Sequence, residues 1–247
     1  MTWRATILTI FPEMFPGPLG LSLAGKALAE GKWALATLDI RDFATDRHRS
    51  VDDTPAGGGA GMVMRADIAA ASIDAARGAM PAGTPTLYLS PRGKPLTQAR
   101  TRELAQGPGL ILLCGRYEGV DDRVRRHLAT EALSIGDFVV SGGELPALVI
   151  VDAVARLIPG VVGDESNVAA DSFASGLLDF PQYTRPAEFE GLGVPPVLLS
   201  GHHAEIRRWR RREALRRTLD QRPELLERAE LSSEDRAMVE EIRKSKK

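Results

Sequence analysis

Short, almost wholly apolar runs alternate with helix-like stretches along the first two thirds of this chain, and this alternation limits the possible folds most strongly. We expect strands at residues 5–11, 33–43, 86–89 and 110–114, and helices at 21–30, 66–77, 97–106 and 144–158. Continuous apolar strands separated by helices predict an α/β fold whose parallel sheet is buried on both faces. In such a sheet, ligands bind beyond the carboxyl ends of the strands.

Three loops of unusual composition follow strand-like runs, at residues 88–94, 114–119 and 134–146. Their glycines allow the backbone to approach a ligand closely. Pro146 suits the first turn of the apolar helix that follows. We therefore predict that the three loops wall one pocket.

The domain boundary is expected after the apolar helix that ends before Pro159 and Gly160. The following stretch is rich in Gly, Ser, Ala, Asn and Asp and has no sustained period, which is typical of a linker. We predict a first domain at 1–160, a linker at 161–176 and a second domain at 177–247 that is helical from His202 onward.

Composition narrows the class of protein. Hydrophobic residues make up 43% and charged residues 26%, and no apolar run approaches the roughly 20 residues of a membrane helix. The first residues lack the features of a secretory signal, so a cytoplasmic protein without membrane attachment is expected. The single cysteine excludes an internal disulfide, and the four histidines show no zinc-ligand spacing.

Positive charge is concentrated near the C-terminus although the net charge of the chain is −1. Residues 202–222 hold eight arginines against three acidic residues. A solvated helix face is one interpretation, but a local excess beside a tryptophan favours phosphate binding. We predict RNA contacts from Arg185, His202, His203, Arg207, Arg208, Arg211 and Arg212.

Several single residues have two interpretations. The glycine cluster at 57–61 lacks the Gly-Lys-Ser/Thr of a phosphate loop and is expected to be a flexible loop. Cys114 is more typical of a small buried hydrophobe than of a nucleophile. Asp171 and Arg156 would ordinarily be a helix cap and a cation at a helix end.

Taken together, the segments resemble the bacterial tRNA (guanine-N1)-methyltransferase family of the knotted SPOUT class. The resemblance covers essentially the whole chain, and its specificity comes from the ordered set of motifs. The matching stretches are 8–15, 48–53, 57–64, 113–121, 134–146, 152–160, 171–173, 183–186 and 197–203.

The resemblance implies a SPOUT domain with a trefoil knot and a parallel sheet, plus a small, mostly α-helical C-terminal domain. It also implies S-adenosylmethionine as methyl donor, bound by the three loops named above. The implied cofactor residues are Tyr88, Leu89, Ser90, Pro91, Gly115, Tyr117, Glu118, Ser134, Ile135, Gly136, Asp137, Phe138, Val139, Val140, Gly142, Gly143 and Pro146.

The substrate that the resemblance implies is tRNA with guanine at position 37, on the 3′ side of the anticodon. N1 of guanine carries a proton that must leave before the nitrogen can accept a methyl group, so a general base is needed. By resemblance Asp171 is that base, and Arg156 stabilises the charge that develops on O6. The resemblance further implies a homodimer with the active site at the subunit interface, and a requirement for Mg²⁺ in which Glu118 takes part.

Two other functions remain open at the level of sequence. One is a SPOUT methyltransferase that acts on a different RNA site, against which the Asp171 segment and the arginine-rich C-terminal region argue. The other is a non-catalytic RNA-binding protein, which retention of Asp171, Arg156 and the three loops disfavours.

Overall fold

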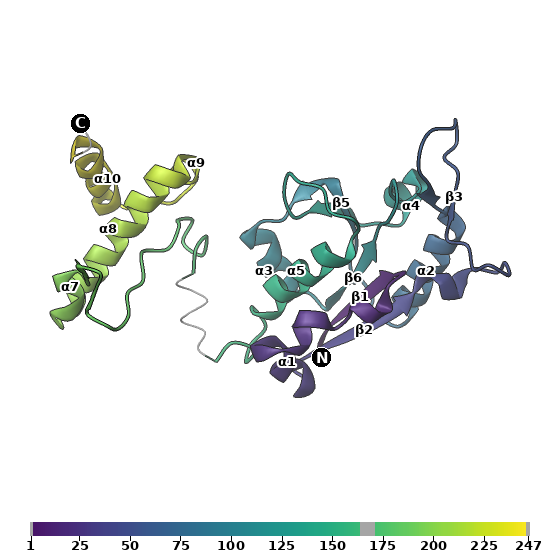
Figure 1. The fold of residues 1–247 in the computed structure, drawn as a ribbon, viewed down its shortest axis with the longest axis horizontal. Helices are drawn as coiled ribbons and strands as arrows, with labels where there is room; N and C mark the ends of the chain where they lie inside the picture. Colours follow the sequence, from purple (N-terminus) through teal and green to yellow (C-terminus); the bar gives the residue numbers. More distant parts are fainter. Residues whose placement is uncertain (1, 164–170, 246–247) are drawn as a thin grey trace. The chain divides into compact units, whose positions relative to one another are not determined.

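The computed structural model describes residues 2–163 and 171–245 of the chain (Figure 1). The chain forms two compact units, Met1–Asp164 and Glu165–Lys247. The division between them falls inside the stretch predicted as a linker.

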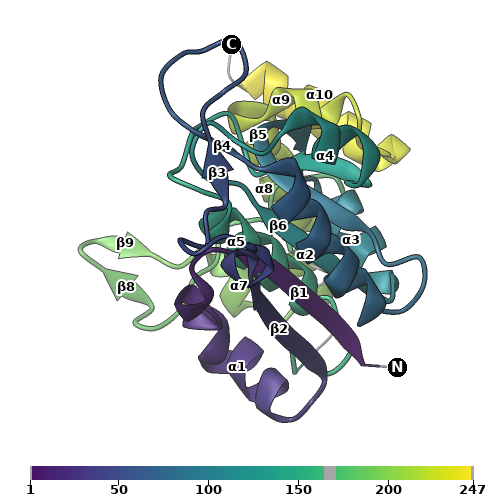
Figure 2. The ribbon, with the colours of Figure 1, turned by 90° about the vertical axis from the view of Figure 1, so that its right-hand side faces the viewer.

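The first unit is built on a five-stranded sheet whose order is β2-β1-β6-β5-β7. The strands are β1 (Trp3–Thr9), β2 (Trp33–Asp39), β5 (Thr86–Pro95), β6 (Gly109–Cys114) and β7 (Glu131–Ser134). All neighbouring pairs are parallel, and Figure 2 shows β1 and β2 side by side. The predicted parallel sheet is therefore confirmed.

Both faces of this sheet are covered, because alternate residues of its strands enter two separate cores. Ile7 and Leu112 pack on one side and Leu8 and Leu113 on the other. The first core includes α1 (Ser22–Ala29), α3 (Gln98–Gln106) and α5 (Glu144–Ala155); the second includes α2 (Ala66–Gly78) and α4 (Asp122–His127). Burial of both faces explains why the central strands are continuous apolar runs.

The second predicted strand is shorter than expected. It ends at Asp39, whose carboxylate accepts a hydrogen bond from the Arg41 backbone N–H and starts the 3₁₀ helix η3 (Ile40–Phe43). Two other 3₁₀ helices, η1 (Pro12–Met14) and η2 (Gly17–Gly20), follow β1. The glycine cluster lies between β3 (Asp52–Asp53) and β4 (Val63–Met64), which pair antiparallel.

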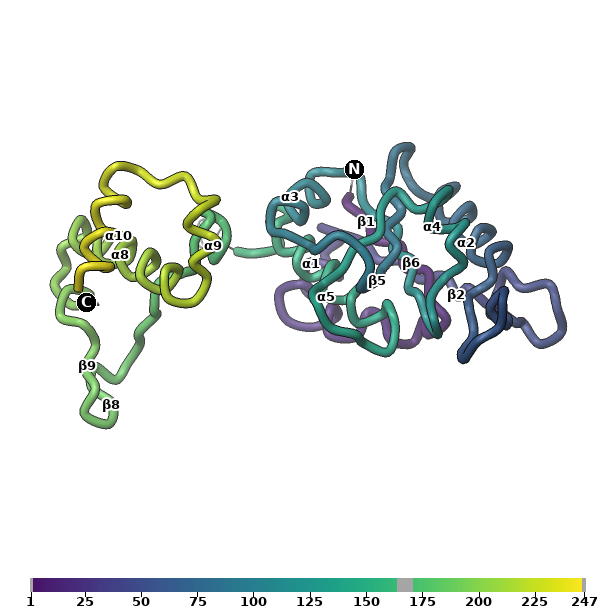
Figure 3. The backbone as a smooth tube through the Cα atoms, turned by 90° about the horizontal axis from the view of Figure 1, so that it is seen from above, coloured from purple at the N-terminus to yellow at the C-terminus, as the bar shows by residue number. Residues whose placement is uncertain are grey.

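The second unit is mainly helical around a small core of Leu177, Leu215, Met238, Val239 and Ile242. Its helices are α7 (Pro196–Leu199), α8 (His203–Gln221), α9 (Pro223–Leu226) and α10 (Ser233–Ser245). The long helix expected at 202–222 is present. A short hairpin of β8 (Glu188–Phe189) and β9 (Leu192–Gly193) extends away from α8 and α10 (Figure 3). No helix in the described ranges could span a bilayer.

Candidate functional site

An open cavity of about 860 Å³ lies beyond the ends of β6 and β7 and beside the part of β5 where pairing with β7 is interrupted between Leu89 and Lys94. The 88–94 segment predicted as a loop is therefore an irregular part of β5. The walls of the cavity come from three segments, residues 88–92, 115–119 and 133–146. The position of the cavity matches the edge at which parallel sheets bind ligands.

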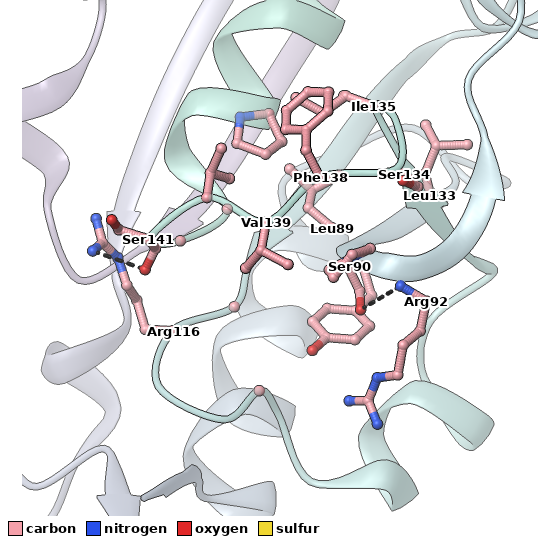
Figure 4. Close-up of a pocket in the computed structure, with 18 of the residues that line it drawn as sticks. Leu89, Ser90, Arg92, Arg116, Leu133, Ser134, Ile135, Phe138, Val139 and Ser141 are labelled. Atoms are coloured by element: carbon pink, nitrogen blue, oxygen red, sulfur yellow. Dashed lines mark hydrogen bonds between the residues drawn. The ribbon is translucent and has the colours of Figure 1, made fainter. Parts of the chain in front are cut away.

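The sequence prediction of a single pocket walled by three loops agrees with this geometry. Every residue predicted to bind the cofactor lines the cavity except Asp137. The cavity also contains residues that the prediction did not name, namely Arg92, Arg116, Gly119, Leu133 and Ser141. In Figure 4, Arg116 and Arg92 lie on opposite sides of the cavity, with Val139 and Leu89 between them. Both arginines belong to the loops singled out in the sequence, so loop membership was the signal that could have identified them.

Two of the loops are packed backbone against backbone. The Gly143 N–H donates to the Gly115 carbonyl at 2.9 Å. A Cβ atom at Gly143 would lie only 2.5 Å from the Cα of Cys114, so any larger residue would push the loops apart. Glycine at this position therefore sets the width of the cavity.

A buried ion pair joins the same loops to β1. Arg116 Nε donates to Glu144 Oε2 at 2.8 Å, and the Glu144 side chain is inaccessible to solvent. The other carboxylate oxygen, Oε1, accepts a hydrogen bond from Thr9 Oγ1 at 2.8 Å. Arg116 also donates to the Ser141 carbonyl at 3.2 Å and lies 4.5 Å from the centre of the Phe11 ring. Charge-assisted hydrogen bonds of this kind fix the position of Arg116 in the cavity wall.

The loop after β7 is held by its own side chains. Ser134 Oγ accepts from the Gly136 N–H at 3.2 Å and donates to the Gly136 carbonyl at 3.0 Å. Phe138 and Val139, which follow, are exposed over 56% and 83% of their surface. This loop therefore presents apolar side chains at the open side of the cavity.

Two titratable groups beside the cavity are held protonated. Burial raises the pKa of the Cys114 thiol far above its usual value, and the charge of Glu144 adds to the shift. Because the thiol is inaccessible and neutral, the prediction that Cys114 is structural is confirmed. Partial burial, followed by the charge of Asp52, raises the pKa of the Tyr117 phenol.

Glu118 lies in the cavity wall next to the glycine cluster. The position that a Cβ atom of Gly61 would take is 2.6 Å from Glu118 Cγ, and the Glu118 N–H donates to the Met62 carbonyl at 3.0 Å. In the part of the chain that the structure describes, no three His, Cys, Asp or Glu side chains cluster closely enough to hold a metal ion. A metal role for Glu118 stays a prediction.

The two predicted catalytic residues belong to different units. Arg156 is the exposed residue at the C-terminal end of α5 in the first unit. Asp171 is half-buried in the second unit and lines a cavity of about 600 Å³ together with Arg207 and Arg210. The same cavity is lined by a third arginine, Arg211, so the Asp171 carboxylate shares it with three guanidinium groups.

The residues predicted to contact RNA fall into two groups. Arg208, Arg211 and Arg212 pair with carboxylates of α10, at 3.6, 2.8 and 3.3 Å. Arg185, His202, His203 and Arg207 are exposed. The sequence prediction did not name Arg210, which lines two cavities of this unit.

Comparisons with known proteins agree with this arrangement. A family model described as tRNA (guanine-1)-methyltransferase, TrmD, matches residues 3–228. A protein of Nitrobacter winogradskyi is 60% identical over 91% of this chain and 93% of its own length. One of Rhodopseudomonas palustris strain HaA2 is 61% identical, over 91% and 88%, and one of Bradyrhizobium diazoefficiens is 56% identical, over 99% and 96%. All three are named tRNA (guanine-N(1)-)-methyltransferase.

Proposed function

Because the chain belongs to the tRNA (guanine-1)-methyltransferase family, we propose that it methylates N1 of guanine 37 in tRNA, with S-adenosylmethionine as the methyl donor. The observation that carries the proposal is the glycine-rich cavity beyond the carboxyl ends of β6 and β7 and beside β5. We expect such an enzyme in the cytoplasm, where its tRNA substrate is found.

The cavity has the features that an adenosine-containing donor requires. Apolar side chains such as Leu89, Ile135 and Val139 can pack against a purine ring. Gly115 and Gly142 leave backbone groups within reach of a ligand. When bound, S-adenosylmethionine would supply an electrophilic methyl group on its sulfonium.

Asp171 is proposed as the general base and Arg156 as the stabiliser of O6. The Asp171 carboxylate accepts the N1 proton of guanine, which frees the nitrogen lone pair for the methyl group. Arg156 then donates hydrogen bonds to O6, where negative charge develops as N1 loses its proton. The nearby Arg207 and Arg210 support this role, because they can hold the RNA backbone close to Asp171.

A homodimer is proposed as the active form, with each site completed by the partner subunit. Its support is an apolar surface on the first unit that includes Leu21 and Leu23 of the α1 region and Leu145 and Val149 of α5, each about half exposed or more. Exposed apolar residues gathered on adjoining elements are typical of an interface. Equal activity in a monomeric form, measured by sedimentation and turnover together, would contradict this part.

The trefoil knot is proposed as the way in which the three loops are brought together. The 115–121 segment pairs with the segment around β4, through Met64 N–H to Gly119 carbonyl at 2.9 Å. It also contacts Gly143 through its Gly115 carbonyl. A knotted crossing, in which one segment passes through the loop formed by another, would bring these segments into such contacts. A knot is a rare exception to ordinary chain topology.

Two further parts of the proposal concern ligands outside the donor cavity. Glu118 is proposed to take part in a Mg²⁺ requirement, which chelation of the metal during turnover would test. Arg185, His202, His203 and Arg207 are proposed to contact tRNA phosphates. Arg208, Arg211 and Arg212 would contribute less, because carboxylates of α10 already pair with them.

The decisive experiment incubates the full chain with methyl-labelled S-adenosylmethionine and two tRNA transcripts that differ only in guanine or adenine at position 37. We expect label at N1 of the guanine transcript and none on the other. Equal labelling of both transcripts would favour a methyltransferase with another RNA site. Tight tRNA binding without any transfer would favour the non-catalytic alternative.

A further inference from the structure

A second open cavity, of about 960 Å³, lies within the second unit between the 180–187 segment and helices α7 and α8. Aromatic and aliphatic side chains line it, among them Phe180, Tyr183, Leu198 and Ile206. Two arginines, Arg185 and Arg210, share its wall. It contains neither Asp171 nor Arg156, although it shares Phe180 and Arg210 with the cavity that Asp171 lines.

The planar groups of this cavity are held by neighbouring side chains. The Tyr183 ring is 48% exposed, and its centroid lies 6.2 Å from that of the Trp209 ring. The Arg210 guanidinium lies 4.9 Å from the centre of the Phe180 ring. Aromatic rings and guanidinium planes are the surfaces on which proteins stack nucleobases.

The arginines of this cavity differ from other arginines of α8 in whether a carboxylate pairs with them. Arg208, Arg211 and Arg212 are neutralised by Glu234, Asp235 and Glu241 of the α10 region. Among the carboxylates at 2–163 and 171–245, none pairs with Arg185 or Arg210. The cavity is therefore both aromatic and cationic, which suits a planar ligand that carries a negative charge.

We propose that this cavity binds an unstacked nucleobase of the tRNA substrate, with Tyr183 and Arg210 as its stacking surfaces. A base in a duplex remains paired and stacked, so the occupant comes from a single-stranded loop of the RNA. It is a different base from the guanine that receives the methyl group, which must lie beside the donor. This inference rests on the proposed function, since it takes tRNA as the substrate.

The test measures tRNA affinity of the full-length protein for two substitutions that remove planarity. Tyr183→Leu keeps an apolar side chain without a ring, and we expect about tenfold weaker binding, as for the loss of one base–aromatic stack. Arg210→Lys keeps the charge without the plane and should also weaken binding. The slope of affinity against salt concentration should not change, because the number of phosphate contacts is the same. Tyr183→Phe should bind like the unaltered protein.

The matched control is Arg216→Lys on the same helix, since Arg216 pairs with Glu213 and lines neither cavity of this unit. It should leave affinity unchanged. Thermal unfolding of each variant identifies any loss of fold. A second readout uses transcripts with 2-aminopurine at successive anticodon-loop positions. One position should show a change in fluorescence on binding that Tyr183→Leu abolishes.

The outcomes separate this inference from the proposed function. If the folded Tyr183→Leu and Arg210→Lys variants both bind tRNA as tightly as Arg216→Lys, the base-binding cavity is wrong while guanine methylation can stand. If the unaltered protein neither binds nor methylates tRNA, both proposals are overturned. If both variants lose affinity in proportion to lost thermal stability, the cavity is structural and the inference fails.

Discussion

Each of the two units contains a buried carboxylate paired with an arginine, but the surroundings of the two pairs differ. Glu144 pairs with Arg116 in the first unit and Asp235 with Arg211 in the second. Arg116 lines the cavity proposed to bind the methyl donor. Arg211 pairs with α10 and is absent from the aromatic cavity of its unit, although it lines the cavity that contains Asp171. A buried pair is costly to assemble and costlier to break.

Similar ion pairs therefore have different roles: one positions a residue of a cavity wall, and the other joins two helices. In the first unit, the pair shapes a ligand site, since Glu144 is bonded to Thr9 of β1 and to Arg116 of a cavity loop. In the second unit, the pair fastens α8 to α10, and arginines without such partners remain for ligand contact. Four experiments test this distinction.

The largest effect is expected for Asp171→Ala, because it removes the proposed base from the second unit and leaves the donor cavity of the first unit intact. Methyl transfer should fall by at least about 100-fold, the usual contribution of a general base. Affinity for S-adenosylmethionine, measured by calorimetry, should not change. Asp74→Ala, at an exposed position of α2, is the control and should retain full transfer. Substantial residual transfer by Asp171→Ala would remove that residue from the base role.

The next effect concerns the pair in the first unit. Glu144→Gln keeps an acceptor for Thr9 but leaves Arg116 without its counter-charge, so we expect a loss of about 3 kcal/mol in the free energy of unfolding. Donor affinity should fall by about tenfold, equivalent to about 1.4 kcal/mol. Glu103→Gln is the control. It breaks an exposed pair with Arg100 and should cost less than about 0.5 kcal/mol. A loss of stability with unchanged donor affinity would show that the pair does not shape the site.

The pair in the second unit should act on stability and leave donor affinity unchanged. Hydrogen bonds from Arg211, with further ones from Ser232, hold the pKa of Asp235 far below its usual range. The folded pKa is thus below the unfolded value of about 3.9, so the pair stabilises the unit fully above about pH 4. This stability is lost as the pH falls through the lower folded value.

Asp235→Asn should therefore lower amide protection in α8 and α10 at neutral pH, by about 2 kcal/mol, and remove the acid dependence below about pH 4. Hydrogen exchange of the full chain measures both effects, and S-adenosylmethionine affinity should not change. The exposed Arg212–Glu241 pair provides the control, Glu241→Gln. An acid dependence that persists in Asp235→Asn would assign it to another group.

The sequence was most informative where apolar patterns are local. Runs such as 110–114 identified the central strands, and the glycine-bearing loops identified most of the residues that line the cavity of the first unit. The 134–146 loop was predicted to follow a strand-like run, but the bounds of that strand, β7, were not predicted, because its four residues, Glu131–Ser134, begin with a charge and show no clear period. It is defined by pairing with β5, about 40 residues earlier in the chain.

Side-chain contacts between residues distant in sequence could not be predicted either, because they depend on how the segments pack in the fold. Glu144 looked like an ordinary first residue of an apolar helix, and only the fold brings it to Arg116 and Thr9. The arginine excess of α8 was clear from the sequence, but its division into paired and unpaired side chains depends on where α10 packs. The stacking of Arg210 on Phe180 likewise joins residues 30 positions apart.

The smallest effect should be seen at Cys114, which lies beside the buried pair of the first unit. Burial first, and then the charge of Glu144, raise the pKa of this thiol, so a thiol reagent should label it only when the native structure opens. Glu144→Gln removes the second of these causes and loosens the surrounding loops, so labelling should become faster. Asp235→Asn should not alter the rate of Cys114 labelling, because the substituted residue lies in the other unit. Rapid labelling of the unaltered protein would contradict the buried position. If labelling became equally faster in both variants, loss of either ion pair would destabilise the first unit, and the two units would not be independent in stability.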